Sequence, residues 1–124
     1  MTGNRKAEAS PDLLVLRRWE EHTTWILEAT NRWPKSMRFT LTQRIQQHAL
    51  DVIEMLVQAR YEPLLRQDLL HETNLRLERM RHIFRCARDL EVCPAKGFER
   101  AMMGIDEVGR MVHGWRKGLG VVSK

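Results

Sequence analysis

Arginine is the residue whose type and spacing in this chain suggest chemistry most clearly. Five arginines occupy the stretch 76–88, namely Arg76, Arg79, Arg81, Arg85 and Arg88. A guanidinium pairs through two hydrogen bonds with a phosphate or a carboxylate, and its plane stacks on nucleobases. On a helical wheel the last three lie within about 60 degrees of one another, beside the apolar arc. We therefore expect a one-sided basic stripe that suits a phosphate backbone.

The alternative is that carboxylates neutralise this stripe. Glu78 and Asp89 lie next to it in sequence, and acidic residues on neighbouring helices can reach it. Such pairs would make the stripe an ordinary solvated helix face. Arg76 differs, because the wheel places it inside the apolar arc, where a charge requires a partner. A half-buried ion pair with Glu54 or Glu107 is the expected arrangement, and a position at a subunit boundary is the alternative.

Catalytic patterns are absent from the sequence. It contains no phosphate-binding glycine loop, no HExxH zinc pair and no GxSxG nucleophile turn. The five histidines are scattered and are more typical of surface or packing positions than of a general base. Cys86 and Cys93 are too few for a disulfide scaffold, and the four-residue spacing of His82 and Cys86 is a weak metal pattern. We expect a non-enzymatic protein without a cofactor or a metal ion.

Composition favours a partner with negative charge. The 124 residues carry a formal net charge of +5 and are 43% hydrophobic, which fits one folded domain, and arginine supplies most of the 21 basic side chains. Nucleic acid or an acidic protein surface is the partner class that this charge favours. No apolar run approaches the roughly 20 residues that cross a bilayer, and the first residues do not resemble a signal peptide. We expect a cytoplasmic protein without a membrane segment.

Four stretches with helical periodicity must position these side chains. They cover 11–31, about 40–61, from between 64 and 70 to 90, and 94 to about 115. Thr40 and Gln43 fit a capping box at the start of the second helix, and Pro94 suits the first turn of the fourth. The predicted inward faces include Trp19, Ile26, Leu27, Leu41, Ile45, Ile53, Leu56, Leu77, Phe84, Phe98, Met102, Ile105 and Val112.

The short connections between these helices predict an all-α, antiparallel up-down four-helix bundle. It should cover residues 11–117, between a flexible N-terminus at 1–10 and a loose C-terminal tail at 118–124. Four large apolar residues point away from the predicted core or lie at its edge: Trp25, Leu75, Met111 and Trp115. Such residues mark contact surfaces, so we expect an oligomer interface there. Isolated exposed apolar residues are the alternative.

Three blocks of the sequence resemble a known family. Residues 33–45, WPKSMRFTLTQRI, look like the P-K-S-x-R-F-T-L-x-x-R signature of small bacterial four-helix bundle proteins. Residues 74–81, NLRLERMR, and 106–111, DEVGRM, followed by Gly114-Trp115, resemble its later blocks. The family includes the accessory variability determinant (Avd) proteins of diversity-generating retroelements. It also includes proteins encoded by intervening sequences in bacterial 23S ribosomal RNA genes, and the blocks do not separate these two branches.

The resemblance implies a homopentameric barrel with a positively charged outer surface. In the retroelement branch it implies binding to the reverse transcriptase and to the template RNA or an RNA–DNA hybrid, in support of mutagenic cDNA synthesis and retrohoming. The positions that match the family blocks and would lie near the binding surface are Arg44, Arg76, Arg79 and Arg81. Arg85 and Arg88 join them from the wheel alone. Lys35 and Arg38 are as well suited to fixing the loop after the first helix, and the ribosomal branch implies a structural module for an acidic protein partner.

Overall fold

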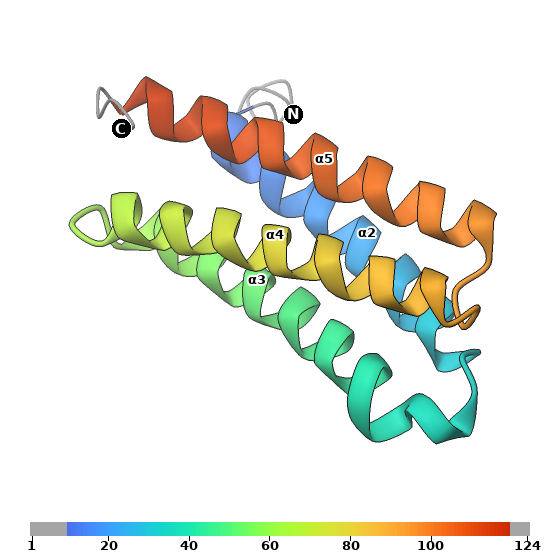
Figure 1. Cartoon of the computed structure of the whole chain (residues 1–124). Helices are drawn as coiled ribbons and strands as arrows, with labels where there is room; N and C mark the ends of the chain where they lie inside the picture. Colours follow the sequence, from blue (N-terminus) through green and yellow to red (C-terminus); the bar gives the residue numbers. More distant parts are fainter. Residues whose placement is uncertain (1–9, 120–124) are drawn as a thin grey trace, which may run out of the picture.

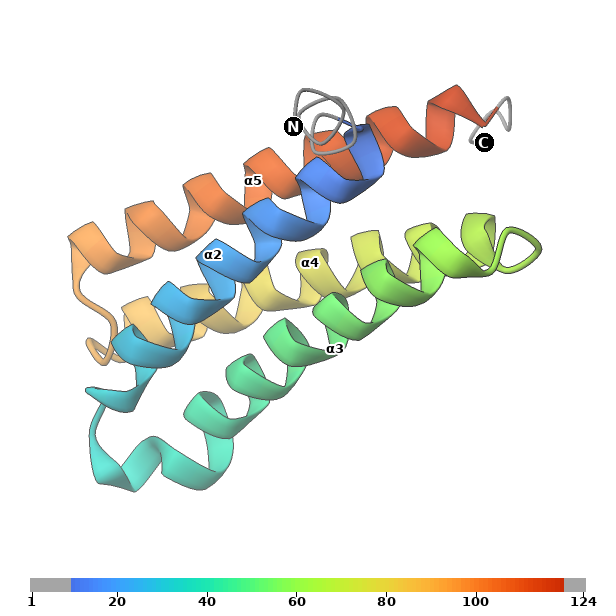
Figure 2. The same cartoon turned by 180° about the vertical axis from the view of Figure 1, so that it is seen from behind.

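The computed structural model describes residues 10–119 and consists of four long helices. They are α2 (Pro11–Asn31), α3 (Gln43–Tyr61), α4 (Arg66–Asp89) and α5 (Ala95–Gly118). Each helix runs antiparallel to the next, and α2 packs against both α3 and α5, as does α4 (Figures 1 and 2). Within the described range there is no strand, which confirms the all-α prediction. The predicted flexible N-terminus at 1–10 and loose tail at 118–124 lie outside the described residues, apart from residues 10, 118 and 119.

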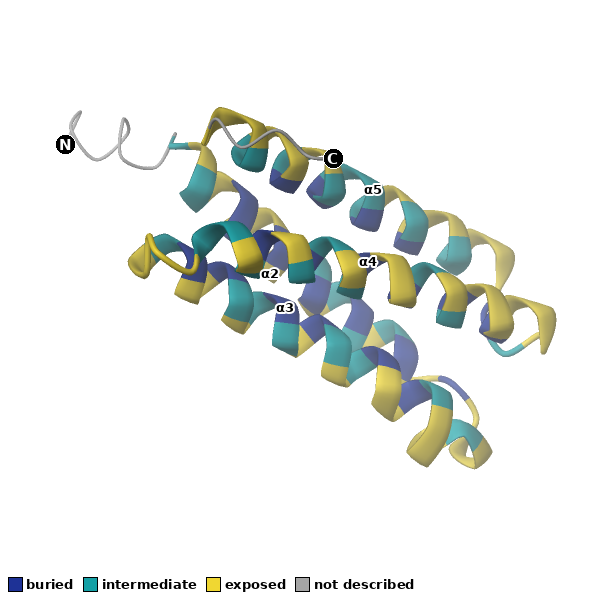
Figure 3. Ribbon diagram, turned by 60° about the vertical axis from the view of Figure 1, so that its left-hand side comes forward, coloured by how far each residue is buried: buried dark blue, intermediate teal, exposed yellow. Residues whose placement is uncertain are grey.

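A single apolar core lies between the four helices, and Figure 3 shows that the buried positions face inward along each of them. Trp19 is its largest fully buried side chain, and its indole Nε1 donates a hydrogen bond to the backbone oxygen of Ala49 at 2.8 Å. That bond satisfies the one polar group that the ring brings into the core. Trp33 closes one end of the core, edge-on to Phe84 with ring centroids 5.9 Å apart.

Most of the predicted inward positions are buried. Five of them are only partly buried: Leu27, Leu41, Ile53, Phe98 and Met102. All of these except Leu27 pack against the outside of the core. They lie at the edges of their apolar arcs, where an adjacent helix covers one side of the residue and solvent reaches the other.

The start of α3 differs from the prediction. A short 3-10 helix η1 (Lys35–Met37) leads into a π-helical turn η2 (Arg38–Thr42), and α3 follows without a break. The backbone N–H of Gln43 donates to the carbonyl of Arg38 five residues earlier, which is the π-helical bond. The hydroxyl of Thr40 donates to the carbonyl of Met37 at 3.3 Å. The predicted capping box is therefore wrong, because Thr40 already lies within a helical turn and its side chain bonds backwards.

The other helix ends depend on proline and on one left-handed residue. Ser10 is the N-cap of α2, with Pro11 in the first turn. Pro94, which was predicted to lie in the first turn of the fourth helix, is instead its N-cap, so α5 begins one residue later, at Ala95. After α4, Glu91 adopts a positive φ of 60°, and the N–H groups of Val92 and Cys93 both donate to the carbonyl of Ala87. This arrangement satisfies the end of the helix and turns the chain towards α5.

Helices α2 and α5 are in close contact where Gly104 faces His22. A Cβ at Gly104 would overlap the imidazole. The ring cannot easily move, since it stacks on Trp25, with centroids 5.5 Å apart and planes 10° apart, and lies edge-on to Trp19. Its Nε2 is also 3.2 Å from the carbonyl oxygen of Ala101. Gly104 is therefore required by a close helix contact, whereas a Cβ at Gly114 in the same helix would meet nothing within 4 Å.

This contrast predicts opposite effects of the same substitution at two positions of α5. Gly114→Ala should raise the free energy of unfolding by up to about 1 kcal/mol, because alanine is the better helix former. Gly104→Ala should lower it by about 1–3 kcal/mol, because the added methyl group displaces a packed ring. Urea unfolding followed by circular dichroism measures both changes. Equal stabilisation by the two alanines would contradict the close contact between α2 and α5.

Candidate nucleic-acid interface

The six arginines predicted to bind a partner form two groups, one where α4 packs against α3 and one where α4 packs against α5. Arg76 and Arg79 turn towards α3, where Arg44 lies, and all three act electrostatically on His48. Arg81 and Arg88 turn towards α5, where they contact Asp106 and Phe98, and Arg85 lies beside them. The structure therefore divides the predicted set into two groups, and the members of each group differ in how far carboxylates neutralise them.

Arg76 forms a half-buried ion pair, as expected, but with other partners. Its Nη1 donates to Asp51 on α3 at 2.6 Å, and its Nε donates to Glu72 at 3.2 Å. The expected partner Glu107 instead pairs with Arg18, and Glu54 is exposed. Burial raises the pKa of Asp51, but hydrogen bonds from Arg76 and Gln47 outweigh this effect and hold the pKa below its usual value. Arg76 thus joins α3 to α4.

Arg44 and Arg79 leave more positive charge exposed. Arg79 is half exposed and its contact with Glu72 is long, at 3.4 Å. Arg44 is exposed and forms no ion pair within residues 10–119. The pKa of His48 is lowered first by burial and then by Arg76, Arg44 and Arg79, which reports a positive potential at this part of the α3–α4 face.

The stripe of Arg81, Arg85 and Arg88 is partly neutralised. Arg81 donates to Asp106 from Nε at 3.0 Å and from Nη2 at 2.8 Å, and from Nη1 to Glu78 at 2.7 Å. Arg88 is 3.4 Å from Asp89, and its guanidinium lies 4.4 Å from the centre of the Phe98 ring.

Arg85 has only a 3.4 Å contact with His82 among the residues described. Glu78 and Asp89, the neutralising residues considered from the sequence, are thus both engaged. Arg85 is exposed and is the member of the stripe that forms no ion pair within residues 10–119.

Three of the four residues predicted at an oligomer interface also pack within the single chain. Trp25, Met111 and Trp115 are partly buried against the core. Arg100 lies 4.8 Å above the ring of Trp25, which stacks on His22. Leu75 is the exception, because it is 39% exposed on the outer face of α4.

A second apolar surface lies on α3 and escaped the sequence analysis. Leu50, Val57 and Tyr61 are exposed, and their spacing of seven and four residues puts them along one line of the helix. Helical spacing was the available signal, but the sequence analysis considered only the core-facing positions of this helix, and these three residues lie outside that face.

A concentration of unpaired positive charge lies at one end of the bundle, where the α2–α3 and α4–α5 connections meet (Figure 1). Two pockets there, of about 510 and 380 Å³, share Trp33 in their walls. Their lining contains no carboxylate and five cations: Arg32, Lys35, Arg38, Lys96 and Arg100. We call these five residues the basic end. None of them forms an ion pair within the described part of the chain.

Sequence reasoning missed the basic end because its members come from two segments far apart in the sequence, the α2–α3 connection and the start of α5. A local signal was nevertheless present, since no acidic residue occurs between Glu28 and Asp51. Lys35 and Arg38 had been considered as residues that fix the loop. Neither side chain forms a hydrogen bond within residues 10–119, so the loop is not held by their polar contacts.

Other kinds of site find little support in the described residues. No group of three or more His, Cys, Asp or Glu side chains there is arranged to hold a metal ion. His82, considered with Cys86 as a weak metal pattern, contacts Glu78 at 3.1 Å. Nor is any helix between residues 10 and 119 long and apolar enough to span a membrane.

The packing of His22 makes stability depend on pH. Burial lowers the pKa of His22 below 6.5, and Arg100 adds to this effect, while the Ala101 carbonyl and Glu107 oppose it. The fold therefore holds the neutral ring. Below about pH 6.5 the unfolded chain binds more protons than the folded chain, so the free energy of unfolding decreases with falling pH.

Thermal unfolding at several pH values tests this dependence. The melting temperature of the wild-type chain should fall between about pH 7.5 and about pH 5.5, because the unfolded state takes up the proton that the fold excludes. His22→Phe keeps an aromatic ring in the stack and removes the titrating group, so its melting temperature should fall less steeply. A slope equal to that of the wild type would show that His22 does not carry the effect.

Comparison with known proteins identifies the family. No curated protein and no solved structure matches the chain. A family model described as bAvd-like matches residues 13–119, which is nearly the whole described range and includes all three sequence blocks and all four helices except the first two residues of α2. The chain belongs to the bAvd-like family.

Proposed function

We propose that this chain is a non-enzymatic accessory protein of a diversity-generating retroelement, which binds nucleic acid and the reverse transcriptase in support of cDNA synthesis. Membership of the bAvd-like family supports the retroelement role. The observation that carries the nucleic-acid part is the basic end, where five cations line two adjacent pockets without a carboxylate. A surface of this kind attracts a phosphate backbone and releases its counterions on binding.

The nucleic-acid contact is centred on the basic end and extends to the exposed arginines nearest to it. Arg44 lies in the first turn of α3 and Arg85 in the second-last turn of α4, so both are close to the same end of the bundle. Arg76 and Arg81 contribute less, because their guanidinium groups are engaged with Asp51 and Asp106. An arginine held by two carboxylates offers little net charge to a phosphate.

The protein acts as a homopentamer in this proposal. The outward apolar residues Leu75 on α4 and Leu50, Val57 and Tyr61 on α3 are available for contacts between subunits. Trp25, Met111 and Trp115 support such contacts from the edge of the core. The reverse transcriptase then docks on the assembled surface beside the bound RNA.

Removing two cations of the basic end should weaken RNA binding and reduce its dependence on salt. Arg32→Gln/Lys96→Gln should lower the slope of log affinity against log salt by about 1.4 for the template RNA, since each single-strand phosphate contact contributes about 0.7. Filter binding at several salt concentrations measures the slope.

The charge-matched control is Arg17→Gln/Lys117→Gln, which removes two exposed cations at the opposite end of the bundle. Equal losses in both variants would contradict a localised surface. Bulk RNA should also compete poorly with template RNA at physiological salt. If it competes equally well, an acidic protein surface becomes the better candidate partner.

Light scattering should give a mass near five times the 14.7 kDa of one chain. The mass should rise when the reverse transcriptase and template RNA are added. Leu75→Gln and Val57→Gln should each lower the mass with unchanged helicity, because they place an amide in an apolar contact. Met103→Gln is the control, since Met103 is 67% exposed and lies outside both surfaces. A monomer that binds neither addition would overturn the accessory role.

A further inference from the structure

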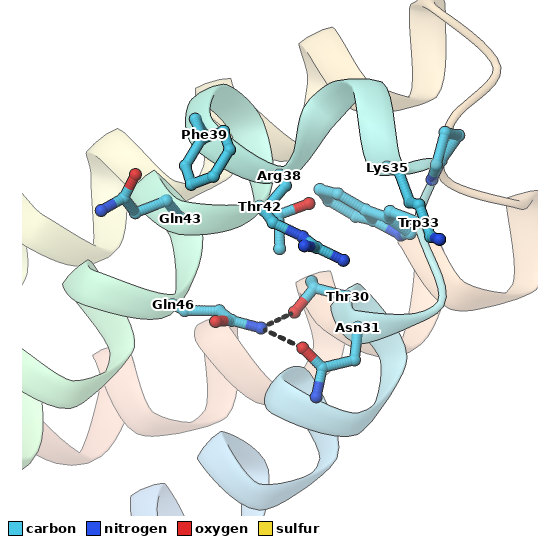
Figure 4. A pocket seen from close by; sticks show the side chains of 10 residues that line it. Thr30, Asn31, Trp33, Lys35, Arg38, Phe39, Thr42, Gln43 and Gln46 are labelled. Atoms are coloured by element: carbon cyan, nitrogen blue, oxygen red, sulfur yellow. Dashed lines mark hydrogen bonds between the residues drawn. The ribbon is translucent and has the colours of Figure 1, made fainter.

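The larger of the two pockets lies against η1 and η2, and we call it the α2–α3 pocket. Its volume of about 510 Å³ falls within the ~300–1,000 Å³ of typical ligand pockets. Figure 4 shows the side chains that line it, with the guanidinium of Arg38 directed into the space and Gln46 of α3 bonded across to Thr30 and Asn31 of α2. The lining residues come from the end of α2, the connection and the start of α3.

A buried hydroxyl in the wall of this pocket lacks a hydrogen-bond partner. Thr42 is only 8% exposed, and its Oγ1 bonds to nothing within residues 10–119. Threonine in a helix usually bonds back to a carbonyl three or four residues earlier, as Thr30 does with Ile26 at 2.7 Å. A buried unpartnered hydroxyl is costly to the fold, and a ligand in the pocket would supply the missing bond.

The pocket also presents two unpaired cations and a set of amides. Lys35 and Arg38 are exposed and form no hydrogen bond or ion pair within the described residues. The amide nitrogen of Gln46 is engaged with Thr30 at 2.9 Å and with Asn31 at 3.0 Å, which fixes the amide and leaves its oxygen free to accept (Figure 4). The pocket therefore combines positive charge with oriented hydrogen-bonding groups.

Two aromatic residues complete the lining and differ in exposure. Trp33 is buried and held edge-on against Phe84, so it forms a fixed wall. Phe39 is 79% exposed, so its ring is open to a stacking partner. A free aromatic ring next to unpaired cations is the arrangement with which proteins stack an unpaired base and hold its phosphate.

We propose that the α2–α3 pocket holds one unpaired nucleotide of a single-stranded segment of nucleic acid. The base stacks on Phe39 and reaches the amides of Gln43 and Gln46. Lys35 and Arg38 hold the adjacent phosphates, and the ligand bonds the hydroxyl of Thr42. This inference rests on the proposed function and makes it more specific, because it names unpaired nucleotides rather than duplex as the ligand.

Base pairing should prevent this mode of binding. In an A-form duplex the bases are stacked inside the helix, and their faces are not available to a protein ring. A pocket that takes a base therefore favours a single strand over the duplex of the same sequence. RNA and DNA share the base and the phosphate, so both sources are compared in the experiment.

The test measures fluorescence anisotropy of end-labelled oligouridylate, about twelve nucleotides long, with the full chain. The same strand paired with oligoadenylate and a matching oligothymidylate are the two comparison ligands. Phe39→Leu should weaken single-strand binding about ten-fold and leave duplex binding nearly unchanged, since stacking on an aromatic ring is lost. Lys35→Gln/Arg38→Gln should weaken single-strand binding more than the charge-matched Arg17→Gln/Lys117→Gln.

Thr42→Val separates a ligand contact from a structural role. Valine keeps the shape of threonine and removes the unpartnered hydroxyl, so the melting temperature should not fall, whereas single-strand affinity should. Independently of any variant, a 4-thiouridine strand irradiated on the wild-type chain should crosslink within residues 33–46.

The outcomes of these measurements are distinguishable. If the wild-type chain binds no nucleic acid at all, the proposed function fails and this inference fails with it. If the wild-type chain binds but the pocket variants lose no more affinity than the control, or the crosslink lies elsewhere, the pocket assignment alone is wrong. Preferential binding of the RNA or of the DNA strand identifies the source of the nucleotide.

Discussion

The burial of Trp19 is the interaction on which the rest of the molecule depends. The ring is fully buried, and its Nε1 bonds to the carbonyl of Ala49, so α2 and α3 are fixed relative to each other by packing and by one directed bond. One turn later His22 lies edge-on to the same ring and contacts the carbonyl of Ala101, which brings α5 to α2. The absence of a side chain at Gly104 allows that approach. Three of the four helices are therefore held around one indole, and α4 closes the core with Phe84 and Leu77.

The same geometry decides where positive charge remains free. Along the helices, carboxylates on the adjacent helix neutralise two of the arginines: Asp51 pairs with Arg76, and Asp106 pairs with Arg81. The stretch between Glu28 and Asp51 contains no acidic residue, and the lining of the two pockets at that end of the bundle contains none either. A net charge of +5 is thus distributed unevenly. Ion pairs join α4 to α3 on one side and to α5 on the other. The cations at the end of the bundle are free to attract a partner, and their field extends about 10 Å at ordinary salt.

Local signals predicted the fold well, and tertiary register limited the prediction of the site. Helix α2 has the bounds that were expected, because Pro11 and Trp33-Pro34 mark its ends within the sequence itself. The start of α3 was missed because a π-helical turn has no such marker, and the Thr40–Gln43 pattern fits a cap that does not form.

The need of Arg76 for a charged partner followed from its place on the helical wheel. Arg76 pairs with Asp51 and not with Glu54 because of the axial register between α3 and α4, which the periodicity of either helix does not determine. The basic end was missed for a related reason, since its two connections meet only in the folded chain.

The π-helical turn has a consequence for how this family can vary. A π turn is one residue longer than the α-helical turn it replaces. Loss of a single codon within 38–42 would convert the π-helical turn into an α-helical turn and would rotate the residues before it by about 100° relative to α3. Helix α3 and its packing would be unchanged, yet the side chains facing the α2–α3 pocket would be exchanged. Insertion and deletion at this one point thus offer evolution a way to alter the lining of the pocket without rebuilding the bundle.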